Sequence, residues 1–322
     1  MKKILIIGPN YIGDVLFTTP AVRTIKLNIP ESYIVYFIRK KYGAFSVIKN
    51  NPDIDKIIAY EDRMTPFYLF YKIKKGNFDI AFVFASGIKR ALIPYLCGIK
   101  ERVGYINEKR RRFKFLFTQR FEEPDKNKIH RVLYYKEIVD RFFGTKIKVS
   151  EYVYEIPEIV EKKIEEKIKN FKSFYPLICF HPFAGTKEKQ WPIEYFIKLG
   201  ELIKEIYPKV KILITGTKKK EEYDLCLKIY NSIKEYSVFL AGETTLEELI
   251  SIYKNCNLLI IGDTGPLHLA CAVRCNLISL FGGSSPEVFG PFGEGKFITI
   301  KKGKIEEIMP EEVINKIIEI LK

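Results

Sequence analysis

The sequence has few of the residues that hold metals or form disulfides. It contains three His and six Cys in 322 residues, and no two Cys form a CxxC pair. Three scattered histidines do not indicate a metal cluster, and isolated Cys in apolar contexts are typical of buried thiols in a reducing compartment. We therefore predict neither a disulfide framework nor a metal site.

Long apolar runs are also missing. No stretch approaches the roughly 20 residues that a membrane-spanning helix needs. The apolar start of the chain is too short for a signal peptide and is followed by Asn10 and Asp14, so it is better interpreted as a buried strand. We expect a cytoplasmic protein.

Acidic residues are too few to balance the basic ones. The chain contains 54 Lys and Arg but 39 Asp and Glu, which gives a net charge of +15. Nucleic acid, an anionic membrane surface and an acidic substrate are all admissible partners for such a chain. The alternative is that the positive charge reflects a Lys-rich composition and serves no partner, because many Lys alternate with Glu on predicted helical faces.

Short apolar runs alternate with helical patterns in two successive halves of the chain. The predicted strands are residues 3–7, 33–38, 57–60, 80–84, 177–180, 211–215, 258–261 and 277–281. Buried strands separated by helices predict parallel sheets covered on both faces. We predict an α/β fold of two Rossmann-like domains that face a central cleft, with ligands at the carboxyl ends of the strands.

The predicted domains have similar sizes. Residues 1–156 form the N-terminal domain, residues 157–172 form a linker helix rich in Glu and Lys, and residues 173–322 form the C-terminal domain. The last helix, residues 310–321, is expected to pack back on the N-terminal domain.

Asp263-Thr264-Gly265-Pro266-Leu267-His268 follows a buried strand and opens a helix. Asp263 or Thr264 can cap that helix, and Gly265 lets the backbone approach a ligand. The free N–H groups and the positive end of the helix dipole predict an anion site, which His268 could also face. An ordinary capped helix with a core histidine is the alternative.

Two further loops follow predicted strands. After residues 177–180, a small-residue loop carries Lys187 and Lys189, and a lysine there can neutralise a phosphate. After residues 3–7, the turn lacks the GxGxxG and Walker patterns but contains Asp14 at a helix start. Asp14 is either a carboxylate that satisfies the helix dipole or a general base beside an acceptor hydroxyl.

The run Lys109–Lys114, which includes Arg110 and Arg112, is the densest basic segment. Nucleic acid is disfavoured because the neighbouring aromatics do not belong to a known RNA-binding module. A solvated loop and a surface for an anionic acceptor or a membrane remain open, and His130 could share the acceptor face.

Four motifs in order along the chain resemble glycosyltransferase family nine, the ADP-heptose:lipopolysaccharide heptosyltransferases. They are Ile-Gly-Asp-Val-Leu at 12–16, Lys-x-Trp-Pro at 189–192, Asp-Thr-Gly-Pro-Leu-His-Leu-Ala at 263–270 and Phe-Gly…Gly-Pro-Phe-Gly at 281–293. The turn at residues 8–14 looks more like the second heptosyltransferase of the inner core than the first. Gly283-Ser284-Ser285 departs from the family's usual Gly-Pro-Thr.

The resemblance implies an inverting transfer by a GT-B enzyme, with domain closure around its substrates. Asp14 would be the base, with Gly13 beside it on the acceptor side, and Lys189 would neutralise the departing ADP. The donor-binding residues that it implies are Gly185, Thr186, Glu221 (for the ribose), Asp263, Thr264, Gly265 and His268.

The implied donor is ADP-heptose, and the implied acceptor is an anionic, lipid-linked core oligosaccharide bound near Arg110, Arg112 and His130. We expect no tightly bound cofactor, with Mg²⁺ at most stimulatory, and a monomer that works peripherally on the inner face of the inner membrane, without nucleic acid. A family member with another nucleotide sugar or a protein acceptor is one alternative, and a non-enzymatic nucleotide or nucleic-acid binding protein is another.

Overall fold

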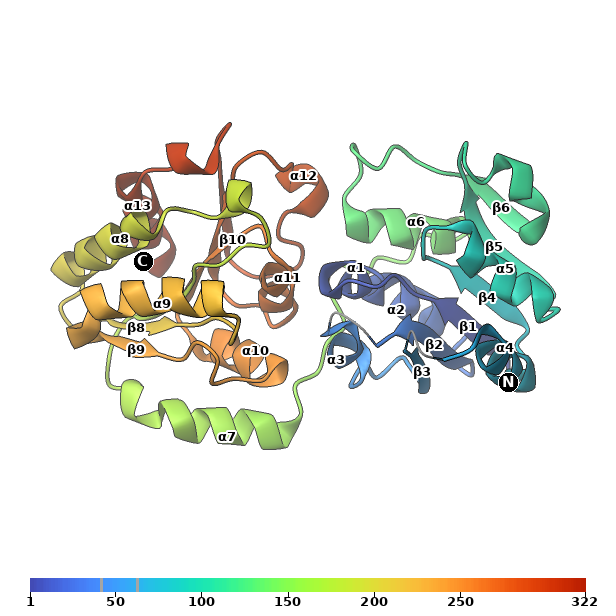
Figure 1. Cartoon of the computed structure of the whole chain (residues 1–322), viewed down its shortest axis with the longest axis horizontal. Helices are drawn as coiled ribbons and strands as arrows, with labels where there is room; N and C mark the ends of the chain where they lie inside the picture. Colours follow the sequence, from blue (N-terminus) through green and yellow to red (C-terminus); the bar gives the residue numbers. More distant parts are fainter. Residues whose placement is uncertain (41–42, 62–63) are drawn as a thin grey trace. The chain divides into compact units, whose positions relative to one another are not determined.

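The computed structural model describes residues 1–40, 43–61 and 64–322, which form two compact units. The first unit is Met1–Glu155 and the second is Ile156–Lys322, one residue from the predicted end of the first domain. Each unit is built on a six-stranded parallel sheet (Figure 1). The predicted α/β fold with two Rossmann-like units is confirmed.

The sheet of the N-terminal unit has the strand order β3-β2-β1-β4-β5-β6. Its strands are β1 (Lys3–Ile7), β2 (Tyr33–Arg39), β3 (Lys56–Tyr60), β4 (Ile80–Val83), β5 (Glu101–Ile106) and β6 (Gln119–Glu122). Leu5 lies opposite Val35 on one side and Ala81 on the other, so apolar runs meet side by side. The apolar pattern predicts β1 to β4 but misses β5 and β6, which carry charged residues.

Helices cover both faces of this sheet. They are α1 (Ile12–Phe17), α2 (Thr19–Asn28), α3 (Ala44–Ile48), α4 (Pro66–Gly76), α5 (Ile88–Leu96), the 3₁₀ helix η2 (Arg111–Leu116) and α6 (Arg131–Phe143). Side chains of α4, α5 and η2 join the core on the face that Leu5 and Ala81 share. On the opposite face, Phe142 of α6 meets Phe82 with ring centroids 5.2 Å apart.

The helix on which Asp14 lies ends at Thr18, and a second helix begins there. The Thr18 hydroxyl donates to the Val15 carbonyl at 2.7 Å, which ends α1. Pro20 then lies in the first turn of α2, where its missing N–H costs nothing. The break confines Asp14 to a helix of two turns at the carboxyl edge of β1.

The C-terminal unit repeats this architecture with the strand order β12-β11-β10-β7-β8-β9. Its strands are β7 (Leu177–His181), β8 (Lys211–Ile214), β9 (Ser237–Phe239), β10 (Leu258–Gly262), β11 (Leu277–Phe281) and β12 (Phe297–Lys301). Its helices are α7 (Glu158–Ile168), η3 (Lys169–Phe171), η4 (Lys187–Lys189), α8 (Ile193–Ile206), α9 (Lys220–Ser232), η5 (Lys234–Tyr236), α10 (Leu246–Asn255), α11 (Gly265–Ala272), α12 (Pro286–Phe289), η6 (Ile305–Glu307) and α13 (Pro310–Leu321).

Two predicted helices, one at each end of this unit, form as expected and belong to the C-terminal unit. The linker helix is α7, and it belongs to the C-terminal unit, where Lys163 pairs with Glu248 at 2.5 Å. The last helix is α13, and its apolar side joins the C-terminal core through Val313 and Ile317. The C-terminal unit therefore buries the apolar face of this helix, and its expected packing on the N-terminal domain stays a prediction.

The six cysteines are all buried free thiols, as the lack of CxxC pairs predicts. Over the ranges that the structure describes, no helix has both the length and the apolar character needed to cross a membrane.

Candidate active site

In the C-terminal unit, three loops meet at the carboxyl edge of the sheet. The strands β7, β10 and β11 are consecutive neighbours in the order β11-β10-β7, so the loops that follow them emerge side by side. Open parallel α/β sheets bind their ligands at this edge. The two motif segments at 189–192 and 263–270 are therefore brought together.

A direct ion pair joins these two motifs. Lys189 Nζ lies 2.5 Å from Asp263 Oδ2, with 36% of the lysine side chain and 8% of the aspartate side chain exposed. The two backbones also approach closely, because a Cβ on Gly262 would stand 3.2 Å from the Lys189 carbonyl oxygen. The buried carboxylate thus fixes a partly exposed ammonium group at the sheet edge.

Trp191 anchors the loop that carries Lys189. Its ring is 2% exposed in the C-terminal core, and its indole N–H donates to the Ile308 carbonyl at 2.8 Å. A buried tryptophan with a satisfied N–H anchors a segment strongly. The Lys-x-Trp-Pro motif therefore combines an anchor with the charge that it positions.

The start of α11 has the properties of an anion site. Thr264 is the N-cap residue, but its side chain makes no capping bond, and Pro266 lies in the first turn. The Thr264 hydroxyl and the Ser284 hydroxyl after β11 are both buried, without a hydrogen-bond partner among the described residues. Buried polar groups are normally satisfied, so two such hydroxyls on neighbouring loops suggest that a ligand supplies the missing bonds.

The other predicted donor residues lie in different surroundings. Gly185 and Thr186 are exposed on the loop before η4. Hydrogen bonds from its own backbone N–H and from the Thr186 hydroxyl lower the pKa of Glu188. His268 lies one turn into α11 and is only 4% exposed, and its contact with an anion stays a prediction.

Two adjacent carboxylates follow β8, and they differ in burial. Glu221 is exposed on the first turn of α9, whereas Glu222 is 2% exposed and accepts a hydrogen bond from the Thr217 hydroxyl at 2.5 Å. A Cβ on Gly216 would lie 3.3 Å from Glu222 Cγ, so only a small residue fits beside it. Glu222 is thus the fixed carboxylate at this edge and our candidate ligand for ribose hydroxyls.

We predict that Glu222→Gln raises the KM for the nucleotide donor by roughly tenfold, because a bond from a hydroxyl to a charged acceptor contributes about 1.5–3 kcal/mol. Glu221→Gln is the matched control and should leave this KM unchanged. Steady-state kinetics with varied donor would measure both, and equal effects of the two substitutions would remove Glu222 from the site.

His181 closes β7 as a neutral, buried group. Its Nδ1 lies 2.9 Å from the Tyr253 hydroxyl and 3.2 Å from the Thr215 hydroxyl. Burial lowers the pKa of His181 to about 4. These contacts hold His181 in place at the end of β7, where it supports the loop that follows.

This burial predicts a defined loss of stability in acid. Above the ordinary His pKa of 6.5 the side chain is neutral in both the folded and the unfolded chain, so its titration does not change the free energy of unfolding there. As pH falls from about 6.5 to 4, only the unfolded chain binds the proton, which costs the folded state on the order of 3 kcal/mol. Urea unfolding at several pH values should show a shallower acid decline for His181→Gln than for the parent chain, and parallel declines would show that the folded state protonates this residue.

In the N-terminal unit, Asp14 lies on α1 at the carboxyl edge of β1, with Gly13 before it. The residue is half-buried. Burial raises the pKa of Asp14, while the charges of Arg131 and Lys126 oppose that rise. A carboxylate with a raised pKa next to two cations is suited to accept a proton from an anionic acceptor's hydroxyl.

The start of α6 lies close to α1. His130 is the N-cap residue of α6, and its Nδ1 accepts a hydrogen bond from the Val132 N–H at 3.2 Å. Its ring also meets Phe17 edge-on, with centroids 6.1 Å apart. His130 therefore helps to place Arg131 near Asp14, whereas its own contact with an acceptor stays a prediction.

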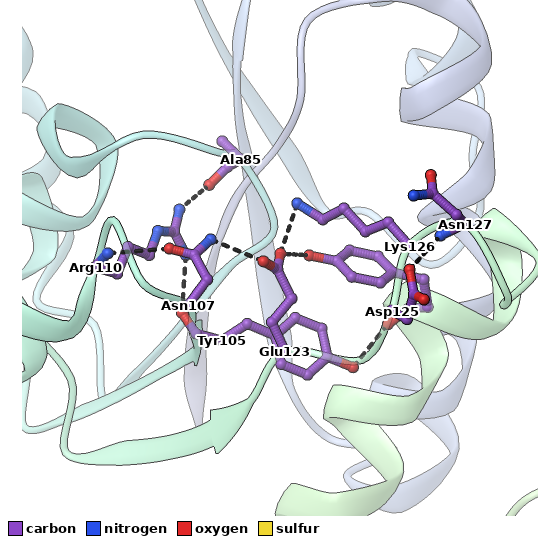
Figure 2. Close-up of polar contacts among 9 residues, drawn as sticks. Ala85, Tyr105, Asn107, Arg110, Glu123, Asp125, Lys126 and Asn127 are labelled. Carbon is purple, nitrogen blue, oxygen red and sulfur yellow. Dashed lines mark hydrogen bonds and ion pairs between the residues drawn. The ribbon is translucent and has the colours of Figure 1, made fainter.

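Figure 2 shows the polar network that holds Lys126, the second cation near Asp14. Glu123 accepts hydrogen bonds from Asn107 at 2.7 Å, from Lys126 at 2.6 Å and from the Tyr134 hydroxyl. Although burial raises the pKa of Glu123, these hydrogen bonds outweigh that effect and lower it. The network keeps Glu123 charged and Lys126 in place.

Arg110 belongs to this network and not to the exposed basic surface that the sequence suggests. Its guanidinium donates to the carbonyls of Ala85 at 2.6 Å and Tyr105 at 3.2 Å, and the residue is 6% exposed (Figure 2). The adjoining cavity of about 20 Å³ has room for a water but not for a sugar. Arg110 therefore supports the strand ends, while Arg112 on η2 is exposed as predicted.

Among the residues that the structure describes, no group of three or more His, Cys, Asp or Glu side chains could hold a metal ion.

The two parallel α/β units have the architecture of the GT-B fold, which solved family 9 glycosyltransferases share. The sequence model of glycosyltransferase family 9 (heptosyltransferase) matches residues 67–317 of this chain. The chain belongs to that family and is a glycosyltransferase.

Relatives match almost the whole chain. Lipooligosaccharide heptosyltransferase 2 of Haemophilus influenzae is 25% identical over 358 aligned residues, which cover 99% of each protein. The family 9 glycosyl transferase of Veillonella parvula has a TM-score of 0.86 at 20% identity, covering 99% of this chain and 97% of that one. E. coli ADP-heptose LPS heptosyltransferase II has a TM-score of 0.81 at 21% identity, covering 100% and 98%. The two solved structures establish the shared fold.

Proposed function

We propose that this protein transfers a heptose from ADP-heptose to the inner core of lipopolysaccharide, with inversion at the anomeric carbon. Its family and the names of its relatives support this donor and acceptor. Within the chain, the observation that carries the proposal is the Lys189–Asp263 pair beside the start of α11. Lys189 supplies a positive charge, and the start of α11 supplies free backbone N–H donors, at the place where a diphosphate would leave.

On the donor side, the bond between the anomeric carbon and the β-phosphate oxygen breaks, and its electron pair stays on ADP. The N–H groups at Thr264 and Gly265 and the Lys189 ammonium stabilise the charge that develops there. The diphosphate competes with Asp263 for this ammonium, which is already held in position. Glu222 holds the ribose by accepting hydrogen bonds from its hydroxyls.

On the acceptor side, the hydroxyl oxygen forms the new bond to the anomeric carbon while its proton moves to the Asp14 carboxylate. Asp14 later releases that proton to solvent. Arg131 and Lys126 supply positive charge to the anionic acceptor and keep Asp14 ionised.

We further propose a monomer on the cytoplasmic face of the inner membrane, held there peripherally, because the acceptor is lipid-linked and the chain carries a net charge of +15. No tightly bound cofactor is required in this mechanism, since Lys189 and the helix start meet the charge of the leaving group, and Mg²⁺ is at most stimulatory.

Calorimetric titration with nucleotides tests the donor assignment directly. We expect ADP and ADP-heptose to bind, and UDP and GDP to bind at least tenfold more weakly. Tighter binding of UDP or GDP would indicate a family member with another nucleotide sugar. Tight, salt-sensitive binding of oligonucleotides without affinity for ADP would contradict the enzymatic proposal.

A further inference from the structure

One face of the N-terminal sheet is covered by α4, α5 and η2, whose inner sides join the core through residues such as Ile73, Ala91 and Leu116. These elements also contact one another. Lys74 Nζ of α4 donates to the Cys97 carbonyl after α5 at 2.9 Å, and Tyr95 of α5 meets Phe115 of η2 with ring centroids 5.5 Å apart. Their outer sides therefore form one continuous area, which we call the α4–α5–η2 surface.

Large apolar side chains are exposed on this surface. On α5, Leu92, Tyr95 and Leu96 share one helical face that points away from the core, because residues three and four apart are neighbours on a helix. The exposed large apolar residues and their exposed fractions are Phe67 78%, Tyr68 41%, Tyr71 56%, Leu92 37%, Tyr95 41%, Leu96 55% and Phe115 53%. Contiguous exposed apolar area of this kind marks an interaction site.

The charged residues within these three elements have a single sign. The sequences of α4, α5 and η2 contain no Asp or Glu, whereas α13 has Glu311, Glu312 and Glu319 among its twelve residues. The exposed basic residues that border the apolar side chains are Lys72, Lys75, Lys89, Arg111, Arg112 and Lys114. In many predicted helices of this chain Lys alternates with Glu, but in these three elements no acidic residue offsets the basic ones.

We propose that the α4–α5–η2 surface docks the protein on an anionic phospholipid bilayer. Aromatic and aliphatic side chains that protrude between lysines and arginines match the interfacial region, where apolar groups enter the acyl boundary and cations meet lipid phosphates. This inference deepens the proposed peripheral membrane location and rests on it. The chemistry of transfer is independent of it and can be tested separately.

Vesicle cosedimentation of the full chain tests the charge contribution. Phosphatidylcholine vesicles with and without 30% phosphatidylglycerol serve as the probe, since roughly that anionic content gives a clear surface potential. The variant Lys72→Gln/Lys75→Gln/Lys114→Gln should lower the partition coefficient on anionic vesicles by about 100-fold, at roughly fivefold for each lysine removed.

A matched variant separates position from total charge. Lys209→Gln/Lys228→Gln/Lys234→Gln removes the same charge from exposed sites in the C-terminal unit and should retain most of the binding. Equal losses in the two triple variants would overturn the assignment to this surface, because the attraction would then follow net charge alone.

The apolar contribution has its own variant. Phe67→Ser/Leu96→Ser/Phe115→Ser leaves every charge in place and should lower binding by at least about tenfold, including at salt concentrations that screen the lysines. Unchanged binding would show that these side chains do not enter the bilayer.

Transfer to a water-soluble, delipidated acceptor is measured in parallel on all three variants. Retained transfer shows that the variants fold and keeps the catalytic proposal apart from the docking proposal. If the parent chain binds no anionic vesicles while it transfers sugar to the soluble acceptor, the docking proposal fails and the transferase proposal stands. That result would indicate that the α4–α5–η2 surface binds an acidic protein.

Discussion

Replacement of Asp14 by Asn should lower kcat for sugar transfer by about three orders of magnitude, since loss of a general base typically costs 10²–10⁴-fold. The affinity for ADP should stay within twofold, because Asp14 belongs to the N-terminal unit and the donor residues to the C-terminal unit. Transfer assays and calorimetry on the same preparation would measure both. Normal turnover in Asp14→Asn would show that another group takes the proton.

The pH profile gives an independent view of the same residue. Only the ionised carboxylate can accept a proton, so kcat/KM should rise with pH through the pKa of Asp14. Burial raises that pKa, which places the acid limb above the usual range for aspartate. Arg131→Gln removes a charge that favours the carboxylate, so the limb should move to higher pH. If the acid limb of kcat/KM in Arg131→Gln stayed in place or moved to lower pH, the charge of Arg131 would not favour the ionised Asp14, contrary to this prediction.

Replacement of Lys189 by Met should lower kcat by about 10²–10³-fold, the usual cost of removing one group that stabilises charge in the transition state. Met keeps most of the unbranched apolar stem of the side chain and removes its charge, so packing around Trp191 is retained. The donor KM should change much less than kcat, because the charge on the β-phosphate grows as the bond breaks.

Lys187→Met is the matched control for that variant. Lys187 lies on the same 3₁₀ turn and is exposed, so loss of its charge changes the loop's net charge by the same amount. We expect kcat within about threefold of the parent chain, as for an exposed charge with little coupling to the reaction. Equal losses in the two variants would mean that the loop's overall charge matters and that the Lys189–Asp263 pair has no special role.

The strands that the sequence predicts are the buried ones. Continuous apolar runs such as those of β1 and β10 have no other plausible location than a sheet covered on both faces. The missed strands lie toward the sheet edges: β6 reads Gln-Arg-Phe-Glu and β9 has three residues, so neither has an apolar period to detect. Edge strands tolerate polar residues because one side is exposed to solvent.

The site could be predicted one motif at a time, but its contacts could not. Lys189 and Asp263 were separately recognisable, yet 74 residues separate them, and only the pairing of β7 with β10 shows that they touch. Glu221 and Glu222 are adjacent, so the sequence gives no reason to prefer one, and the packing of α9 decides which is buried. Arg110 looked like part of a basic surface because its carbonyl partners on Ala85 and Tyr105 come from strand ends, which a local pattern does not reveal.

The most direct test of the account is transfer of a single heptose by the purified protein. ADP-heptose is incubated with an inner-core acceptor, and mass spectrometry of the acceptor is combined with quantification of ADP. The account predicts an acceptor heavier by one heptosyl residue, one ADP for each residue transferred, and an inverted anomeric configuration in the product. Transfer only from a UDP- or GDP-linked sugar, or no consumption of ADP-heptose in the presence of the acceptor, would contradict it.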